Sequence, residues 1–283
     1  MSISPVFRPW CWALFWLSLF MGIGGCIYFG QEYWRREVVR IYASGELKNS
    51  EGSSPAALLI GDSLVRMSFP RDIDVPLLLG GEQPWGKIWV PGGSYMDFSS
   101  LALAFPKGMG LVLVNQDILL KDDFWITRRA FRRFWNLFVR AVKRGSIEEA
   151  FWRQQQRIKH TCEREARFTD KVINNLIQRY TSSPVLSDEA IEFLRLLDAN
   201  SKQLVVIRLP RSSSLEERLS AAFTSFQPKL LDVLDKEGIQ HVELGPAMPD
   251  EFYCDGSHPN ELGKAVRTEQ LVKLVREKLL STR

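Results

Sequence analysis

The sequence predicts an α/β fold, a three-layer, doubly wound and mainly parallel sheet of five strands. Most of its five short apolar runs are rich in Val, Ile and Leu and lack polar alternation, as expected of strands buried on both faces. Helical patterns lie between these runs, and this alternation is typical of doubly wound sheets. The five runs are Ala57–Ile60, Lys87–Val90, Gly110–Val114, Leu204–Leu209 and Ile239–Leu244.

The N-terminus predicts a membrane anchor. No charged residue occurs from Pro9 to Gly30, and this run has about the length of a bilayer-spanning helix, roughly 20 residues. There are two rival interpretations. One is a cleaved signal peptide, and the other is a bacterial lipoprotein, because Ile23–Cys26 resembles a lipoprotein cleavage box. The preferred division is a transmembrane anchor at 1–30, a polar stalk at 31–54 and one α/β domain at 55–283.

Two long helical patterns are expected in the C-terminal part of the domain. They are Glu216–Lys236, which is predicted to break or kink near Pro228, and Glu261–Leu280. A further segment, about 122–200, holds more helix than one crossover needs and is predicted to be a helical insertion. It begins with an aromatic stripe opposite several arginines over 124–144. A helix packed on the core is favoured there over one that lies on an anionic membrane or docks a partner.

Composition narrows the class of protein. The chain has 283 residues, is 45% hydrophobic and 25% charged, and carries a net charge of +4 with a pI near 8.9. These values fit one folded domain with an appendage and give no sign of a nucleic-acid-binding module. Cys11 and Cys26 lie in the apolar N-terminal run, so at most Cys162 and Cys254 can pair in the soluble part.

The candidate chemistry is concentrated in two tetrapeptides near the two ends of the domain. Gly61–Leu64 (Gly-Asp-Ser-Leu) places Ser63 where the first strand should stop and a helix should begin. Asp255 and His258 lie three residues apart, so one turn can present both groups to the same point. A serine nucleophile needs a base within hydrogen-bond reach, and the base needs a partner that fixes its tautomer. The sequence therefore predicts a catalytic set of Ser63, His258 and Asp255, with Asp62 bracing the loop.

The same residues have non-catalytic interpretations. Ser63 could cap the helix that follows it, which is a common role for serine. Asp255 and His258 could bind a metal, although no second cluster of His, Cys or carboxylate residues stands out. We expect neither a metal nor a cofactor.

Four other polar residues are not expected to belong to the catalytic set. His160 and His241 are expected to be structural or exposed, because one lies in a Lys/Arg-rich helix and the other in a strand pattern. Arg208 and Arg211 surround the end of the fourth run and could contact an anionic substrate. A solvated loop is the favoured interpretation, since arginine is mostly exposed in folded proteins.

Gly-Asp-Ser-Leu after a first strand, with Asp-x-x-His before a C-terminal helix, resembles the SGNH (GDSL) hydrolase superfamily. The resemblance covers most of the chain from about Pro55 onward and implies a flavodoxin-like, three-layer α/β fold. It also implies an oxyanion hole built from a glycine after the second strand and an asparagine after the third. Gly93, or else Gly92, fills the first position, and Asn115, or else Gln116, fills the second. The glycine that the family has before this asparagine is missing here.

The resemblance implies an enzyme that hydrolyses or transfers ester-linked acyl groups through an acyl-enzyme on Ser63. Membrane-tethered proteins that the chain resembles act on acetyl groups of exported polysaccharides, sometimes beside a multi-span acyltransferase. The expected partners are therefore the membrane, an acylated carbohydrate, and a multi-span acyltransferase or polysaccharide-export protein. The alternative from another class is a non-catalytic interaction subunit of a membrane complex that keeps the fold.

The flanking charges and the resemblance differ on the orientation of the anchor. Arg35, Arg36 and Arg40 follow the apolar run and outnumber Arg8 before it, which by the positive-inside rule predicts a cytoplasmic domain. Anchored members of the superfamily usually work outside the cytoplasm. We follow the resemblance and expect a single-pass membrane protein with an extracytoplasmic, periplasmic catalytic domain.

Overall fold

The computed structural model describes the α/β domain in several segments and only a few residues near the N-terminus. The described residues are 57–69, 85–89, 93–102, 108–121 and 170–281, together with 14, 16–18, 21 and 22. The predicted stalk at 31–54, most of the predicted anchor, Gly92, and the insertion from 122 to 169 with its aromatic pattern lie outside these residues. The chain divides into two compact units, Met1–Val38 and Val39–Arg283.

The described residues of the first unit are helical, and their apolar side chains are exposed. Leu14, Trp16, Leu17 and Met21 keep between 50% and 64% of their surface accessible. No helix within the described ranges combines the length and the apolar character that a bilayer crossing requires. The membrane anchor therefore stays a prediction from the sequence.

The second unit contains the predicted five-stranded sheet, and all of its strand pairs are parallel. The order is β2-β1-β3-β4-β5. Each strand overlaps one of the five apolar runs, so the predicted fold class is confirmed. The strands are β1 (Ala57–Gly61), β2 (Trp85–Trp89), β3 (Met109–Asn115), β4 (Ser201–Arg208) and β5 (Gln240–Glu243).

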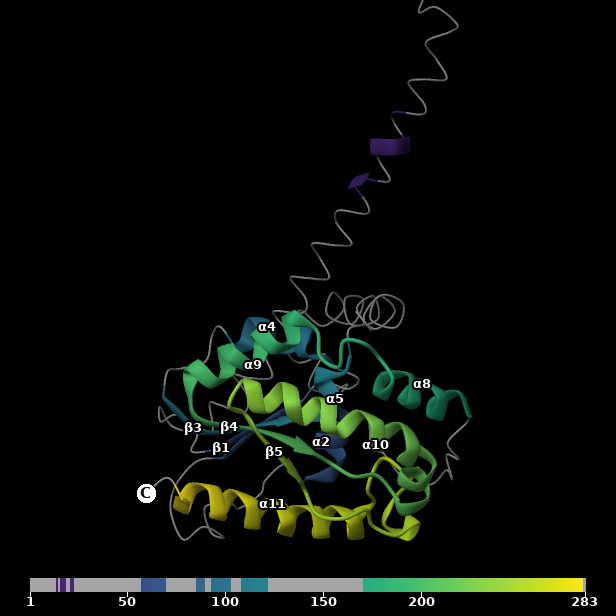
Figure 1. Ribbon diagram of the computed structural model, residues 1–283, viewed down its shortest axis with the longest axis vertical. Helices are drawn as coiled ribbons and strands as arrows, with labels where there is room; N and C mark the ends of the chain where they lie inside the picture. Colours follow the sequence, from purple (N-terminus) through teal and green to yellow (C-terminus); the bar gives the residue numbers. More distant parts are fainter. Residues whose placement is uncertain are drawn as a thin grey trace, which may run out of the picture. The chain divides into compact units, whose positions relative to one another are not determined.

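Helices cover both faces of this sheet. Figure 1 shows α11 on the opposite side of the sheet from α4 and α9. The described helices are α2 (Ser63–Ser68), α4 (Tyr95–Ala102), α5 (Gln116–Leu119), α8 (Asp170–Tyr180), α9 (Asp188–Asn200), α10 (Ser213–Lys236) and α11 (Glu261–Ser281). The described end of the predicted insertion forms α8 and α9, and α9 packs against α4 and β4.

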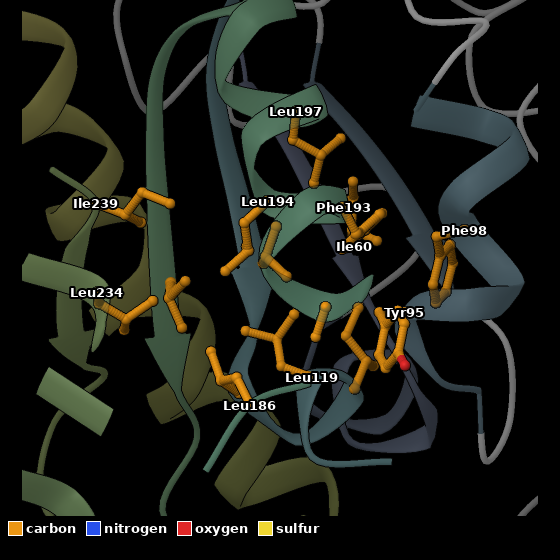
Figure 2. Close-up of a cluster of buried hydrophobic side chains, with 14 of the residues drawn as sticks. Ile60, Tyr95, Phe98, Leu119, Leu186, Phe193, Leu194, Leu197, Leu234 and Ile239 are labelled. Carbon is orange, nitrogen blue, oxygen red and sulfur yellow. The ribbon is translucent and has the colours of Figure 1, made fainter. Parts of the chain in front are cut away.

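The larger core lies between the sheet and the helices α4, α8, α9 and α10. Leu58 and Ile60 of β1 join this core, and Figure 2 shows Ile60 near Phe193 of α9. The ring centroids of Tyr95 in α4 and Phe193 are 6.4 Å apart. Leu59, which points to the other face, is also fully buried. Burial on both faces explains why the strand sequence is continuously apolar and does not alternate.

Helix α10 runs without interruption through Pro228, so of the predicted break or kink the break is wrong. Proline removes one backbone hydrogen bond and crowds the preceding turn, which costs about 3 kcal/mol in a helix interior. Leu219 and Phe226 on one side of Pro228, and Leu230 and Leu234 on the other, are almost fully buried in the main core. Burial of both halves offsets the local cost, because tertiary packing overrides intrinsic propensity.

The strand order places a topological switch point between β1 and β3. The chain moves from β1 outward to β2 and then returns to add β3 on the other side of β1. Crossovers leave the sheet in opposite directions at such a point, so a crevice forms at the carboxyl ends of the two strands. Ser63 directly follows β1, and Asn115 is the last residue of β3. The fold therefore brings two predicted site residues to one edge of the sheet.

Candidate active site

Ser63 lies on the sharp turn that joins β1 to α2, as the sequence predicts. It is the first residue of α2, and Asp62 is the N-cap, whose Oδ1 accepts a 2.9 Å hydrogen bond from the Leu64 N–H. A side chain at Gly61 would meet Val65 Cγ2 at 2.2 Å, so glycine is what allows the turn to pass so close to its own helix. The helix cap is therefore Asp62, which leaves the hydroxyl of Ser63 free of that role.

The structure brings Ser63, His258 and Asp255 together from opposite ends of the domain. Ser63 Oγ lies 3.1 Å from His258 Nε2, across 195 positions of sequence. On the other side of the ring, His258 Nδ1 lies 2.7 Å from Asp255 Oδ2. Both distances lie within hydrogen-bond reach for a nucleophile, a base and the group that orients the base.

The turn from Asp255 to His258 fixes the carboxylate as well as the imidazole. Asp255 Oδ1 accepts the backbone N–H groups of Ser257 at 3.1 Å and of His258 at 2.7 Å. Burial alone would raise the pKa of Asp255, but the hydrogen bonds and charge of His258 and the backbone donors hold it below its ordinary value. The side chain is therefore an anion near neutral pH. Its Oδ2 selects the tautomer in which Nδ1 carries the proton and Nε2 faces Ser63 with a lone pair.

Asn115, rather than Gln116, lies beside the turn of Ser63. Its Nδ2 donates to Asp62 Oδ1 at 3.3 Å, and its Oδ1 accepts the N–H of Asp117 at 3.4 Å. These two contacts orient the amide and use one of the two N–H groups of Nδ2. Gln116 points away, toward β5, where its Oε1 lies 2.8 Å from His241 Nε2. A one-residue step along a strand reverses the side-chain direction, which separates the two candidates.

Gly93 is buried two residues before α4 begins at Tyr95. The carbonyl oxygen accepts a 3.1 Å hydrogen bond from Lys121 Nζ. The next N–H along the chain, that of Ser94, donates to Asp97 Oδ2 at 2.8 Å. The Gly93–Ser94 peptide is therefore held at both ends, although the role of the Gly93 N–H as an oxyanion donor stays a prediction.

Lys121 is the residue at this site that the sequence analysis missed. Its Nζ lies 2.5 Å from Asp62 Oδ2, and the lysine is 8% exposed. Burial alone would raise the pKa of Asp62, but the charge and hydrogen bond of Lys121, with the Leu64 N–H, lower it below the ordinary value. A single lysine two residues beyond a short helix carries no motif. No signal in the sequence distinguishes it from a surface lysine.

Arg208 and Arg211 are buried, so the expected solvated loop is wrong. They are 5% and 4% exposed. Arg208 forms ion pairs with Glu216 of α10 and, at 2.7 Å, with Glu243 of β5. The side chain of Arg211 contacts Asp117, and its Nη1 lies 3.1 Å from the hydroxyl of Tyr180. Both guanidinium groups therefore form ion pairs with acidic side chains of other elements, and a buried charge requires such pairing.

A metal interpretation gains no support from the residues that the structure describes. Among them, no group of three or more His, Cys, Asp or Glu side chains is placed to hold a metal ion. Asp255 and His258 face each other and Ser63 instead. Their contacts are those of a hydrogen-bonded relay.

His241 is partly buried in β5, between Gln116 and the cation of Arg208. Burial, and then the charge of Arg208, lower the pKa of His241 to about 4. In the unfolded chain a histidine titrates near its ordinary value of about 6.5. Between these two pH values the unfolded state binds a proton that the folded state does not bind. His241 therefore costs no stability above about pH 6.5 and progressively destabilises the fold as the pH falls toward 4.

We expect the free energy of unfolding to fall by up to about 3 kcal/mol more in the wild type than in His241→Gln between pH 6.5 and pH 4. Urea unfolding of both proteins, followed by circular dichroism across this range, measures the difference. Carboxylates that titrate in the same window cancel in the comparison. Parallel stability curves for the two proteins would contradict the prediction.

Comparison with known proteins yields matches only among solved structures. No family model matches the chain, and no curated protein does. An extracellular lipase of Streptomyces rimosus is 10% identical with a TM-score of 0.43, over 78% of this chain and 99% of its own. A GDSL-like lipase of Bacteroides thetaiotaomicron is 10% identical with a TM-score of 0.42, over 83% and 97%. An acetylxylan esterase of Geobacillus stearothermophilus is 10% identical with a TM-score of 0.41, over 79% and 95%.

These three similar structures carry the names lipase and esterase. The domain itself has the predicted architecture, a parallel five-stranded sheet with Ser63 after β1 and His258 before α11. This is the α/β fold that the resemblance implies.

Proposed function

We propose that the protein is a serine esterase or O-acyltransferase that works through an acyl-enzyme on Ser63. One observation carries this proposal. Ser63 Oγ, His258 Nε2, His258 Nδ1 and Asp255 Oδ2 form a continuous relay with contacts of 3.1 Å and 2.7 Å. A serine that only capped a helix would need neither an imidazole nor a carboxylate behind it.

The first half-reaction transfers the acyl group to the enzyme. Ser63 Oγ attacks the ester carbonyl while His258 Nε2 accepts its proton, and Asp255 stabilises the imidazolium that forms. The carbonyl oxygen becomes an oxyanion, for which the N–H groups of Ser63 and Gly93 and the Nδ2 of Asn115 are the proposed donors. Ser63 begins α2, where backbone N–H groups have no partner within the helix. His258 then returns the proton to the departing alkoxide.

The second half-reaction decides between an esterase and a transferase. His258 takes a proton from water or from a sugar hydroxyl, and the resulting oxygen nucleophile attacks the acyl carbon on Ser63. The bond between the acyl carbon and Ser63 Oγ then breaks, and His258 returns the proton to Oγ. Water gives a free acid, and a sugar hydroxyl gives a new ester. The same three side chains serve both outcomes, so the acceptor that enters the crevice sets the result.

We further propose that the substrate is an acetyl ester on exported polysaccharide and that the domain is tethered outside the cytoplasm. The apolar run from Pro9 to Gly30 and the resemblance to membrane-tethered enzymes support the tether. Cys254 is disulfide-bonded. Disulfides persist in oxidising compartments such as the bacterial periplasm, which supports this location. Alkaline phosphatase fused after Arg283 should be active, whereas an inactive phosphatase together with a fluorescent protein fusion would contradict the orientation.

Mass spectrometry of the intact protein tests the acyl-enzyme directly. After brief exposure to a chromogenic acetyl ester and rapid acid quenching, the mass should rise by one acetyl group, and peptide mapping should place the group on Ser63. Turnover with and without added oligosaccharide then distinguishes transfer from hydrolysis, because transfer produces acetylated sugar.

A fluorophosphonate probe distinguishes the enzyme from the non-catalytic interaction subunit. Labelling of Ser63 needs an activated hydroxyl, so the enzyme is expected to react. A well-folded protein that takes up neither the probe nor an acetyl group would favour the interaction subunit.

A further inference from the structure

Lys121 contacts two loops whose relative position matters for the proposed reaction. Its Nζ lies 2.5 Å from Asp62 Oδ2, on the turn of the nucleophile, and 3.1 Å from the carbonyl oxygen of Gly93. These two loops follow different strands, β1 and β2, and lie 59 and 28 positions from Lys121 in the sequence, respectively. One buried ammonium group thus bridges the nucleophile turn and the glycine proposed for the oxyanion hole.

The contact with Asp62 links Lys121 to the turn that carries Ser63. Asp62 Oδ1 accepts the Leu64 N–H at 2.9 Å and the Asn115 Nδ2 at 3.3 Å, while Oδ2 accepts Lys121. The carboxylate is therefore the cap of the helix that Ser63 begins and also a support for the Asn115 amide. Its negative charge is buried, and Lys121 is the cation that contacts it directly, while the charge of Arg211 adds a smaller stabilisation.

The contact with Gly93 fixes a peptide plane. The carbonyl of Gly93 accepts Lys121, and the N–H of the same peptide, that of Ser94, donates to Asp97 at 2.8 Å. Because a peptide group is planar, two buried side chains at opposite ends hold its orientation. The backbone N–H of Gly93 belongs to the preceding peptide, which is joined to this plane through the Gly93 Cα.

We propose that Lys121 is a positioning residue that holds the nucleophile turn and the oxyanion-hole loop in one geometry through Asp62 and the Gly93 carbonyl. The inference rests on the function proposed above and goes beyond it, because it assigns a role to a residue outside the nucleophile, base and oxyanion donors. Lys121 acts through other groups and does not touch the reacting atoms. Its removal should weaken stabilisation of the transition state more than binding of the substrate.

A second buried lysine provides a matched control. Lys87 in β2 is 2% exposed, and its Nζ donates to the Phe69 carbonyl at 2.9 Å, beyond the end of α2 that lies away from Ser63. Replacing it with methionine removes a buried ammonium group of the same size from the same domain. A merely structural role for Lys121 predicts that Lys121→Met and Lys87→Met behave alike.

The experiment compares wild type, Lys121→Met, Lys121→Arg and Lys87→Met with a chromogenic acetyl ester and an arylboronic acid. A boronate on the serine forms a tetrahedral adduct whose oxygen occupies the oxyanion site, so its affinity reports on that site. For Lys121→Met we expect kcat to fall by about 10- to 100-fold, with the boronate inhibition constant rising by a similar factor and KM nearly unchanged. Lys121→Arg retains donors for both contacts and should stay within about tenfold of wild type. Lys87→Met should keep kcat and boronate affinity within about threefold of wild type, whatever its stability.

A double variant keeps the test decisive if Lys121→Met fails to fold. Asp62→Asn/Lys121→Met removes both buried charges, and asparagine is as good a helix cap as aspartate. We expect this variant to fold and still to lose kcat and boronate affinity, because the Gly93 carbonyl has lost its donor. A folded single or double variant with wild-type kcat and boronate affinity would overturn the inference while leaving the proposed enzyme intact. If the wild type neither hydrolyses the ester nor takes up a fluorophosphonate, the proposed function is overturned first.

Discussion

Replacement of Ser63 by alanine is expected to lower kcat on an acetyl ester by about 10⁶-fold, to the level that oxyanion donors and binding can supply alone. The loss is large because the Ser63 hydroxyl, whose oxygen lies 3.1 Å from His258 Nε2, is the group that forms the proposed acyl-enzyme. The same variant should show neither fluorophosphonate labelling nor an acetyl adduct in its intact mass. Steady-state kinetics and mass spectrometry of the purified protein measure these outcomes.

Ser68→Ala is the matched control for this variant. Ser68 lies in the same helix, five residues further on, and is 1% exposed. Its replacement removes a buried hydroxyl outside the relay, so kcat should stay within about threefold of wild type. Full turnover by a folded Ser63→Ala protein would show that the nucleophile lies elsewhere.

Replacement of Asp255 by asparagine is expected to lower kcat by about 10⁴-fold while the turn stays intact. The backbone N–H groups of Ser257 and His258 both donate to Oδ1, and an asparagine oxygen can accept them in the same way. The amide nitrogen then faces His258 Nδ1, which must present a lone pair to it. The ring proton moves to Nε2, and that nitrogen can no longer accept the proton of Ser63.

The control for Asp255→Asn is Asp250→Asn. Asp250 lies five residues upstream of Asp255. It accepts hydrogen bonds from the N–H of Ser214 at 3.3 Å and from the Ser214 hydroxyl at 2.6 Å, and these contacts do not belong to the relay. The hydrogen bonds from the hydroxyl and the backbone N–H of Ser214 lower the pKa of Asp250 below its ordinary value. Its amide variant should keep kcat within about threefold of wild type. A tautomer effect can be checked by nitrogen NMR of the histidine ring, and an unchanged Nδ1–H signal in Asp255→Asn would contradict the mechanism.

Much of the site could be predicted because it depends on local sequence. Gly61–Leu64 determines a strand end, a cap and a helix start within four residues, and Asp255 and His258 are held by hydrogen bonds within one turn. Asp62 was expected to brace the loop, and its carboxylate does accept the N–H of Leu64. Such short-range geometry follows from backbone capping rules that a sequence pattern reveals.

The residues that were missed or misjudged depend on distant partners. The guanidinium of Arg208 can be buried because it forms ion pairs with Glu216 of α10 and Glu243 of β5. Lys121 meets Asp62 across 59 positions. A charged side chain is buried only where opposite charges compensate it, and a single sequence does not show which charges will meet.

The sequence by itself determined the five parallel strands and the two tetrapeptides that contain the proposed nucleophile, base and orienting group. These features follow from apolar runs and turn chemistry, which act over a few residues. Only the tertiary structure decided that Asn115 rather than Gln116 lies beside Ser63, that α10 continues through Pro228, and that Lys121 joins two loops. Each of those outcomes is set by contacts between distant elements, where packing and charge pairing outweigh local preference.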